Sequence, residues 1–249
     1  SQGRFILGLG SSSQTMIEGW HGLPFEKPLA RIRESVALLR QIFAGKKTAF
    51  DGQTIASHGF RQPATGHPQR IYLAALRPKM LELAGEIADG VILNLYPQEA
   101  LPKIIEHLRI GAERGGRDFA SFDVVTRIQV AVTDDPSDEI DLFRMMYAPY
   151  FATPVYNKYL DWTGHADTAR DIREGWQDKD RQRTTGALTD DLIQSIAVTG
   201  TLDSCHARIR ADFDAGVSTA MITTVSPHAA VREKTLHAFG ASQFELPDD

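Results

Sequence analysis

Five short apolar runs, each bounded by glycine or polar residues, recur along this 249-residue chain. They lie at residues 3–9, 71–75, 91–94, 124–132 and 217–225. The first run, Gly3-Arg4-Phe5-Ile6-Leu7-Gly8-Leu9, does not alternate polar and apolar residues, which is typical of a strand covered on both faces. Strands of this kind require helices on both sides of the sheet that they form.

Amphipathic segments separate these runs. After Pro28, apolar residues follow at spacings of three and four, which predicts a helix of about four turns. Further helices are expected at 79–88, 98–114, from about 138, from 189 through 196, from 201 to 216, and at 229–239. A small hairpin is expected at 47–55 and a long loop at 11–27. The repeated order of strand and helix predicts the α/β class with a parallel sheet, which binds ligands at the carboxyl ends of its strands whether open or closed.

Composition narrows the function classes. The chain has 27 Lys and Arg against 32 Asp and Glu, a net charge of −5, which disfavours a surface for nucleic acid or anionic membrane. No apolar run approaches the roughly 20 residues that span a bilayer. A single cysteine, Cys205, excludes a disulfide framework within the chain and favours a cytoplasmic protein, and its place on the apolar face of a helix predicts a core residue. The histidines have no metal-ligand spacing.

Residues 146–187 differ from the rest of the chain. They are first rich in aromatic residues and then, from Asp167 to Arg183, strongly charged. We expect an excursion with helical pieces that covers a site or a partner surface, and a solvated face for the charged part.

Gly8-Leu9-Gly10, followed by Ser11-Ser12-Ser13, allows three interpretations. The glycines could open a dinucleotide fingerprint, but the predicted helix is too far away for its amides to hold a phosphate. They could simply allow close strand packing. The third interpretation is a loop that passes beside a bound cofactor, with the serine hydroxyls as hydrogen-bonding groups.

The segment Ala74-Ala75-Leu76-Arg77-Pro78-Lys79 is the stronger candidate for anion binding. Small residues end a strand, a helix begins at once, and two cations flank the helix N-terminus. Free backbone amides at such a place bind phosphate. The alternative is a surface turn with solvated cations.

Four further residues are candidates for the same end of the sheet. Trp20 and His21 are expected in a loop there, and a loop histidine can act as an acid, a base or a substrate donor. Asn94 ends the third predicted strand and Arg127 lies in the fourth, both expected at the rim or interior of the sheet. Each of these residues could equally be structural.

Taken together, four segments make the sequence recognisable. GRFILGLGSSS, EGWHGLPFEKPLARIRE, IYLAALRPKMLELAGEIADGVILN and TGTLDSCHARIRADFDAGVSTAMI resemble the bacterial luciferase-like superfamily, and most closely its branch that uses the deazaflavin coenzyme F420. The resemblance implies a (β/α)8 TIM-type barrel, commonly dimeric, in which GRFILGLG is the fourth strand. Residues 1–249 would then be a single barrel domain without its first three strands, with its excursion at about 146–187.

The resemblance also implies a site. Ser11, Ser12 and Ser13 match the loop beside the cofactor ring, and the turn Ala75-Leu76-Arg77, with Lys79 beside it, matches the contact with the ribityl phosphate. Asn94 is added as a cofactor-binding residue. Many relatives have glycine where Arg77 stands, so Arg77 adds a cation but obstructs a close backbone approach.

The activity implied is hydride transfer between F420 and a small organic substrate, with His21 as the substrate-facing proton donor or acceptor and Trp20 shaping the pocket. The alternatives are an FMN-dependent monooxygenase and a non-catalytic flavin-binding relative. The sugar-phosphate-oxidising subgroup carries a Glu near Ser13 and a Lys near Pro97, and this chain has neither, which argues against that substrate.

Overall fold

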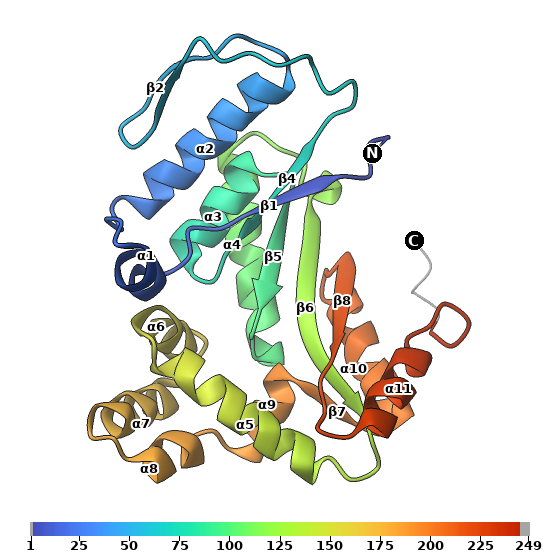
Figure 1. Ribbon diagram of the computed structural model, residues 1–249. Helices are drawn as coiled ribbons and strands as arrows, with labels where there is room; N and C mark the ends of the chain where they lie inside the picture. Colours follow the sequence, from blue (N-terminus) through green and yellow to red (C-terminus); the bar gives the residue numbers. More distant parts are fainter. Residues whose placement is uncertain (1, 245–249) are drawn as a thin grey trace. The chain divides into compact units, whose positions relative to one another are not determined.

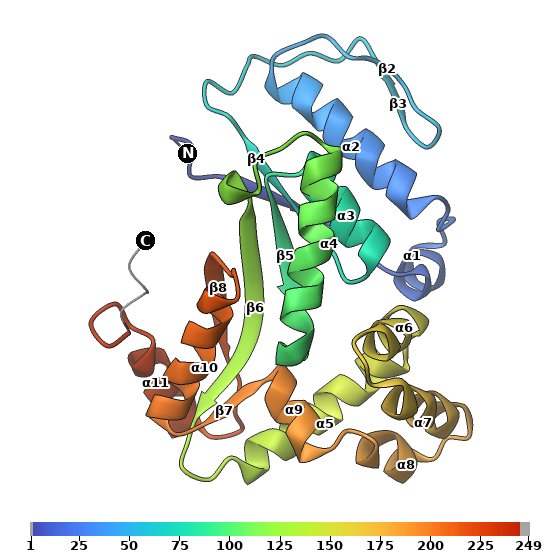
Figure 2. The ribbon, with the colours of Figure 1, turned by 180° about the vertical axis from the view of Figure 1, so that it is seen from behind.

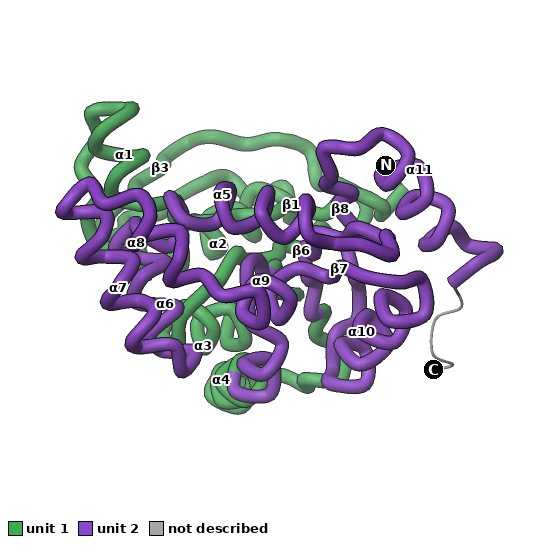
Figure 3. The backbone as a smooth tube through the Cα atoms, turned by 90° about the horizontal axis from the view of Figure 1, so that it is seen from below, with its two compact units in different colours: residues 1–92, 104–123 green, residues 93–103, 124–249 purple. Residues whose placement is uncertain are grey.

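The computed structural model describes residues 2–244 and divides the chain into two compact units (Figure 3). Unit 1 comprises residues 1–92 and 104–123, and unit 2 comprises residues 93–103 and 124–249. The single domain expected from the sequence stays a prediction.

Unit 1 is built on a parallel sheet in which β4 pairs with β1 on one side and β5 on the other (Figure 1). Leu73 lies opposite Leu9 and Val91 in this sheet, and both Leu73 and Val91 are fully buried. The elements are β1 (Ile6–Leu9), α1 (Gln14–His21), α2 (Pro28–Phe43), β2 (Ala49–Asp51), β3 (Ala56–His58), β4 (Arg70–Ala74), α3 (Pro78–Ile87), β5 (Gly90–Asn94), α4 (Leu101–Arg114) and the 3-10 turn η2 (Phe119–Ser121). The last residues of β5 and the first of α4 belong to unit 2.

Unit 2 is built on the long strand β6, which pairs in parallel with β7 and with β8. Helices α10 and α11 pack on these strands, where Ile128, Val198, Cys205, Ile209 and Ala238 share one core cluster (Figure 2). The elements are η1 (Gln98–Ala100), β6 (Asp123–Val132), α5 (Ser137–Ala152), α6 (Pro154–Trp162), α7 (Ala166–Gln177), α8 (Arg181–Gly186), α9 (Asp190–Ile196), β7 (Val198–Gly200), α10 (Leu202–Asp214), β8 (Thr219–Thr224) and α11 (Ala229–Ala238).

The parallel α/β class is confirmed, and the expected excursion consists of the end of α5 with α6, α7 and α8. The hairpin forms but extends to His58. Strand β7 was missed, because its three residues lie directly between two helices. Among the described residues, no helix is long and apolar enough to cross a membrane.

The opening strand is the first correction. It was expected to be covered on both faces, yet Phe5 is 49% and Ile6 44% exposed. Within the described chain β1 pairs only with β4, so it is an edge strand with one unpaired side. An unbroken apolar run shows that its residues favour burial. The number of strands that pair with it depends on the tertiary structure, which the run itself does not specify.

The expected loop at 11–27 is the second correction, because it contains α1. Ser13 caps this helix: its hydroxyl oxygen accepts a hydrogen bond from the Met16 N–H at 3.4 Å. Gly22, at φ 64°, ends it in the left-handed conformation that favours glycine. The helix therefore begins soon after β1, not at Pro28, and Trp20 and His21 lie in its last turn rather than in a loop.

Helix α3 is held tightly against its neighbours in unit 1. Arg33 of α2 donates two hydrogen bonds of 2.7 Å to Glu86. Gly85 and Gly111 let the backbones of α3 and α4 approach so closely that a Cβ on either glycine would overlap a backbone oxygen of the other helix. The N-terminus of α3 is thereby fixed beside the sheet.

Glu34 of α2 holds the turn of the β2–β3 hairpin. Its carboxylate accepts hydrogen bonds from the N–H groups of Gln53 (2.7 Å), Thr54 (2.9 Å) and Ile55 (3.2 Å) and from the Thr54 hydroxyl (2.6 Å). A carboxylate with several donors keeps its charge to low pH, and these bonds, led by that of the Thr54 hydroxyl, lower the pKa of Glu34 from 4.5 to about 2.

Because this pKa is lowered on folding, we expect the stabilisation from Glu34 to be complete above about pH 4.5 and to disappear as the pH falls towards 2. A carboxyl-detected NMR titration should give a midpoint near 2 for Glu34, and the hairpin amides should exchange faster in Glu34→Gln. A Glu34 midpoint near its ordinary value of 4.5 would contradict the assignment.

Candidate functional site

The turn after β4 has the features of an anion site. Ala75 is buried, while Arg77 and Lys79 are exposed at the start of α3. Among the described residues, nothing accepts a hydrogen bond from the N–H groups of Leu76, Arg77 and Lys79. Unpaired N–H groups at the positive end of a ten-residue helix, with two cations beside them, are suited to a phosphate.

The backbone of Arg77 is unstrained. At φ −123° and ψ 162° it is extended, a conformation that any residue adopts. The side chain is exposed, and whether it obstructs a close backbone approach stays a prediction. The cation is therefore an addition to the turn.

The loop after β1 lies beside the same turn. The register that pairs Leu9 with Leu73 brings Gly10 next to Ala74, and a Cβ built on Gly10 would lie 3.3 Å from the Ala74 Cβ. Ser12 has a φ of 58°, the left-handed region that non-glycine residues rarely adopt, which turns the chain into α1. The chain therefore enters Ser11–Ser13 and the Ala75–Lys79 turn from the same edge of the sheet.

The three serines have different local roles. The Ser13 oxygen is engaged as the cap of α1, which leaves its O–H as a donor. The Ser11 hydroxyl bonds only the adjacent Ser12 carbonyl at 3.3 Å, and the Ser12 hydroxyl makes a weak contact with the Met16 sulfur at 3.6 Å. Ser11 and Ser12 can therefore exchange these weak partners for a ligand.

Trp20 and His21 project from the end of α1 into solvent. Trp20 is 71% exposed, and the His21 side chain makes no hydrogen bond or ion pair with any described residue. No hydrogen bond, ion pair or ring contact joins them to the turn after β4 in the described part of the chain. Their role in a site stays a prediction.

Asn94, at the carboxyl end of β5, belongs to unit 2. Its Oδ1 is buried and has no hydrogen-bond donor among the described residues. The turn that follows contains Leu95 in the left-handed region, at φ 52°, and is anchored by the Tyr96 hydroxyl, which donates to the buried Asp212 carboxylate at 3.0 Å. Arg208 of α10 completes this buried group by pairing with Asp212.

The Tyr96–Asp212–Arg208 group was not predicted from the sequence. Asp212 is fully buried, although carboxylates are rarely buried without a partner. The available signal was the spacing of four between Arg208 and Asp212, which puts the two side chains on one face of the same helix. Tyr96 gave no signal, because its partner is 116 residues away in the chain.

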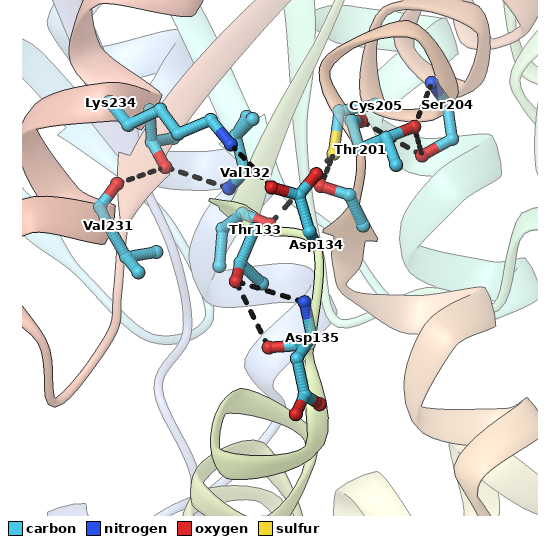
Figure 4. Close-up of polar contacts among 12 residues, drawn as sticks. Val132, Thr133, Asp134, Asp135, Thr201, Ser204, Cys205, Val231 and Lys234 are labelled. Carbon is cyan, nitrogen blue, oxygen red and sulfur yellow. Dashed lines mark hydrogen bonds and ion pairs between the residues drawn. The ribbon is translucent and has the colours of Figure 1, made fainter.

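The polar side chains drawn at the carboxyl end of β6 are engaged in hydrogen bonds or ion pairs with one another (Figure 4). The Thr133 hydroxyl accepts from the Asp135 N–H, and the Thr201 hydroxyl accepts from the Ser204 N–H to cap α10. Lys234 lies 3.5 Å from Asp134. Cys205 is fully buried, so its predicted place in the core is confirmed, and burial raises the pKa of its thiol to about 11.

Comparisons of this chain with known proteins point to one family. The model of the luciferase-like monooxygenase family matches residues 1–219. The 5,10-methylenetetrahydromethanopterin reductase of Methanolobus tindarius is 31% identical over 244 residues, which cover 96% of this chain and 73% of that protein.

Solved structures share the fold. The coenzyme F420-dependent tetrahydromethanopterin reductase of Methanopyrus kandleri superposes with a TM-score of 0.75 at 23% sequence identity. The match covers 96% of this chain and 73% of the reductase chain. A type II Baeyer–Villiger monooxygenase of Pseudomonas putida, solved with FMN, superposes with a TM-score of 0.64 at 18% sequence identity. The match covers 100% of this chain and 73% of the monooxygenase chain.

Proposed function

The chain belongs to the luciferase-like monooxygenase family, and on this premise we propose that it transfers a hydride between the deazaflavin coenzyme F420 and a small organic substrate. One observation carries the proposal: the turn after β4 offers three free N–H groups and two exposed cations. These groups fit the phosphate of a ribityl cofactor. The choice of F420 is supported by the reductase of the same fold that is named as F420-dependent.

We assign the binding of the cofactor to two segments of unit 1. The residues are Ser11, Ser12, Ser13, Ala75, Leu76, Arg77 and Lys79. The N–H groups of Leu76, Arg77 and Lys79 bind the phosphate, and the serine hydroxyls donate to the ring and ribityl chain. When bound, the deazaflavin supplies the two-electron chemistry, while the protein orients it and excludes water.

FMN is the alternative cofactor, in a monooxygenase, because the same turn fits its phosphate and a monooxygenase of this fold binds FMN. A non-catalytic flavin-binding relative is the third candidate. A homodimer and a cytoplasmic location are proposals that accompany the family.

The test is to titrate the protein with F420 and with FMN, following cofactor fluorescence. We expect F420 to bind more tightly than FMN, and Arg77→Ala to weaken F420 binding about tenfold through loss of one charge-assisted hydrogen bond. Lys46→Ala, which removes another exposed cation of unit 1, is the matched control and should change nothing. Tight FMN binding without F420 binding would select the alternative, and binding without turnover would select the third candidate.

His21 is proposed as the group that gives a proton to the substrate, or takes one from it, at an imidazole nitrogen, and Trp20 as a wall of the pocket. We expect His21→Ala to lower kcat about a hundredfold, the usual contribution of general acid–base catalysis, and to leave the Kd for F420 unchanged. His67→Ala, another exposed histidine of unit 1, is the control. Unchanged turnover in His21→Ala would remove His21 from the mechanism.

A further inference from the structure

The two faces of β6 in unit 2 differ in chemistry. Ile128 and Val130 are buried and pack with Cys205 and Ile209 of α10. Because successive side chains of a strand point to opposite faces, Arg127 and Gln129 lie on the other face. That face carries a cation and an amide in the middle of a parallel sheet, where apolar residues are the rule.

Arg127 has no partner among the described residues. The chain pairs four other arginines of the same unit with carboxylates, namely Arg144, Arg170, Arg183 and Arg208. Arg127 makes neither a hydrogen bond nor an ion pair, and its side chain is exposed. An exposed arginine on a helix surface is usually just solvated. An arginine in the centre of a parallel strand is unusual, because apolar residues are the rule there, and a bound ligand would explain its presence.

An apolar side chain lies beside this cation. In the register of β6 with β8, Met221 is the direct partner of Arg127, and 45% of Met221 is exposed. Direct partners on neighbouring strands point to the same face. Arg127 and Met221 therefore form adjacent charged and apolar parts of one accessible surface.

Tyrosines of α5 and α6 border the same face. The Tyr147 hydroxyl donates to the Gln129 Oε1 at 3.2 Å, and the rings of Tyr150 and Tyr156 meet edge to face at 5.6 Å. Burial raises the pKa of both Tyr147 and Tyr156, and the positive charge of Arg127 acts in the opposite direction on both hydroxyls. The guanidinium thus lies within electrostatic reach of both rings.

Asn94 meets the same group of side chains. Its amide also lowers the pKa of Tyr156, against the effect of burial, by hydrogen bonding with that side chain. Its buried Oδ1 still lacks a donor among the described residues, an arrangement that is costly unless a ligand supplies one.

We propose that Arg127 binds a carboxylate of the substrate, and that Met221 and Tyr156 contact the apolar part of the same molecule. This assignment of a substrate class rests on the proposed function. The planar guanidinium matches a carboxylate with two parallel hydrogen bonds, and a single cation suits a single negative charge better than a dianionic phosphate. The substrate class is therefore a small organic acid with an apolar body, and a hydroxyl or N–H group of it would satisfy the Asn94 oxygen.

The test compares phenylacetate with its neutral isostere phenylacetamide as probes, using ligand-observed NMR or calorimetry. The wild-type protein should bind phenylacetate at least about tenfold more tightly, and Arg127→Gln should abolish this preference. Arg170→Gln removes an exposed arginine of α7 and is the control for net charge. Because Arg127 has no hydrogen-bond or ion-pair partner within residues 2–244, thermal unfolding of Arg127→Gln should match that of the wild type. Equal binding of the two probes, binding of neither, or a preference retained in Arg127→Gln overturns the proposal.

A parallel titration with F420 separates this inference from the proposed function. Wild-type protein that prefers phenylacetate but does not bind F420 would refute the proposed cofactor and leave the carboxylate site intact. F420 binding that is lost in Arg127→Gln, without any preference for phenylacetate, would assign Arg127 to the anionic tail of the cofactor and overturn the substrate assignment. We expect F420 affinity to be unchanged by Arg127→Gln.

Discussion

Replacing Gly111 by alanine is expected to lower the free energy of unfolding by about 3 kcal/mol. The added Cβ would overlap the carbonyl oxygen and carbon of Glu82 in α3. Both are backbone atoms, which a rotamer change cannot move, so the two helices must separate. The higher helix propensity of alanine recovers only about 1 kcal/mol of the loss. Urea unfolding followed by circular dichroism measures the difference.

Gly19→Ala is the matched control for this substitution. Gly19 also lies in a helix, α1, but no atom lies within 4 Å of the position that a Cβ would take there. Alanine at this position should stabilise the helix by roughly 0.5–1 kcal/mol, because glycine is a poor helix former. Similar effects of Gly19→Ala and Gly111→Ala would show that propensity, not close approach, governs both sites.

The same substitution should reach the proposed cofactor site. Helix α3 begins at Pro78, directly after the turn that carries the free N–H groups, so a shift of α3 away from α4 displaces those groups. We therefore expect Gly111→Ala to weaken cofactor binding even under conditions where the protein stays folded. Full affinity in the folded variant would mean that the turn is positioned by β4 alone.

A structural feature of this chain is predictable from the sequence to the extent that its signal is local. The turn after β4 was predictable, since a buried strand, small residues and Pro78 at a helix start follow one another directly. Helix α2 was predicted for the same reason, from the apolar spacing after Pro28. Helix α1 was missed because it has only eight residues and contains Gly19, a poor helix former, although Met16, Ile17 and Trp20 follow at helical spacings.

Signals that depend on distant partners were not available in the sequence. The exposure of β1 depends on which strands pair with it. Arg127 is recognisable in the sequence as a polar residue in a strand, but whether it has a partner depends on residues far away in the chain, such as Met221 on β8. The buried group around Asp212 joins two elements far apart in the chain.

Asp212→Ala is expected to lower the free energy of unfolding by about 4 kcal/mol. Asp212 is fully buried, and its removal leaves the Arg208 guanidinium, only 12% exposed, without its counter-charge and the Tyr96 hydroxyl without its acceptor. Desolvated groups that lose their partners account for the largest effects of single substitutions. Asp214→Ala, an exposed aspartate at the end of the same helix, should change the value by no more than about 0.5 kcal/mol.

Two further variants separate the charge pair from the hydrogen bond. Tyr96→Phe removes only one hydrogen bond and should cost about 1 kcal/mol. The double variant Arg208→Met with Asp212→Leu removes both charges and should be more stable than Asp212→Ala, because no unpaired charge stays buried. If the double variant is instead the less stable of the two, the ion pair itself stabilises the fold. In either case, the turn between Asn94 and Tyr96 should loosen when Asp212 is lost, and faster amide exchange at Leu95 and Tyr96 in Asp212→Ala would show that the pair positions the end of β5.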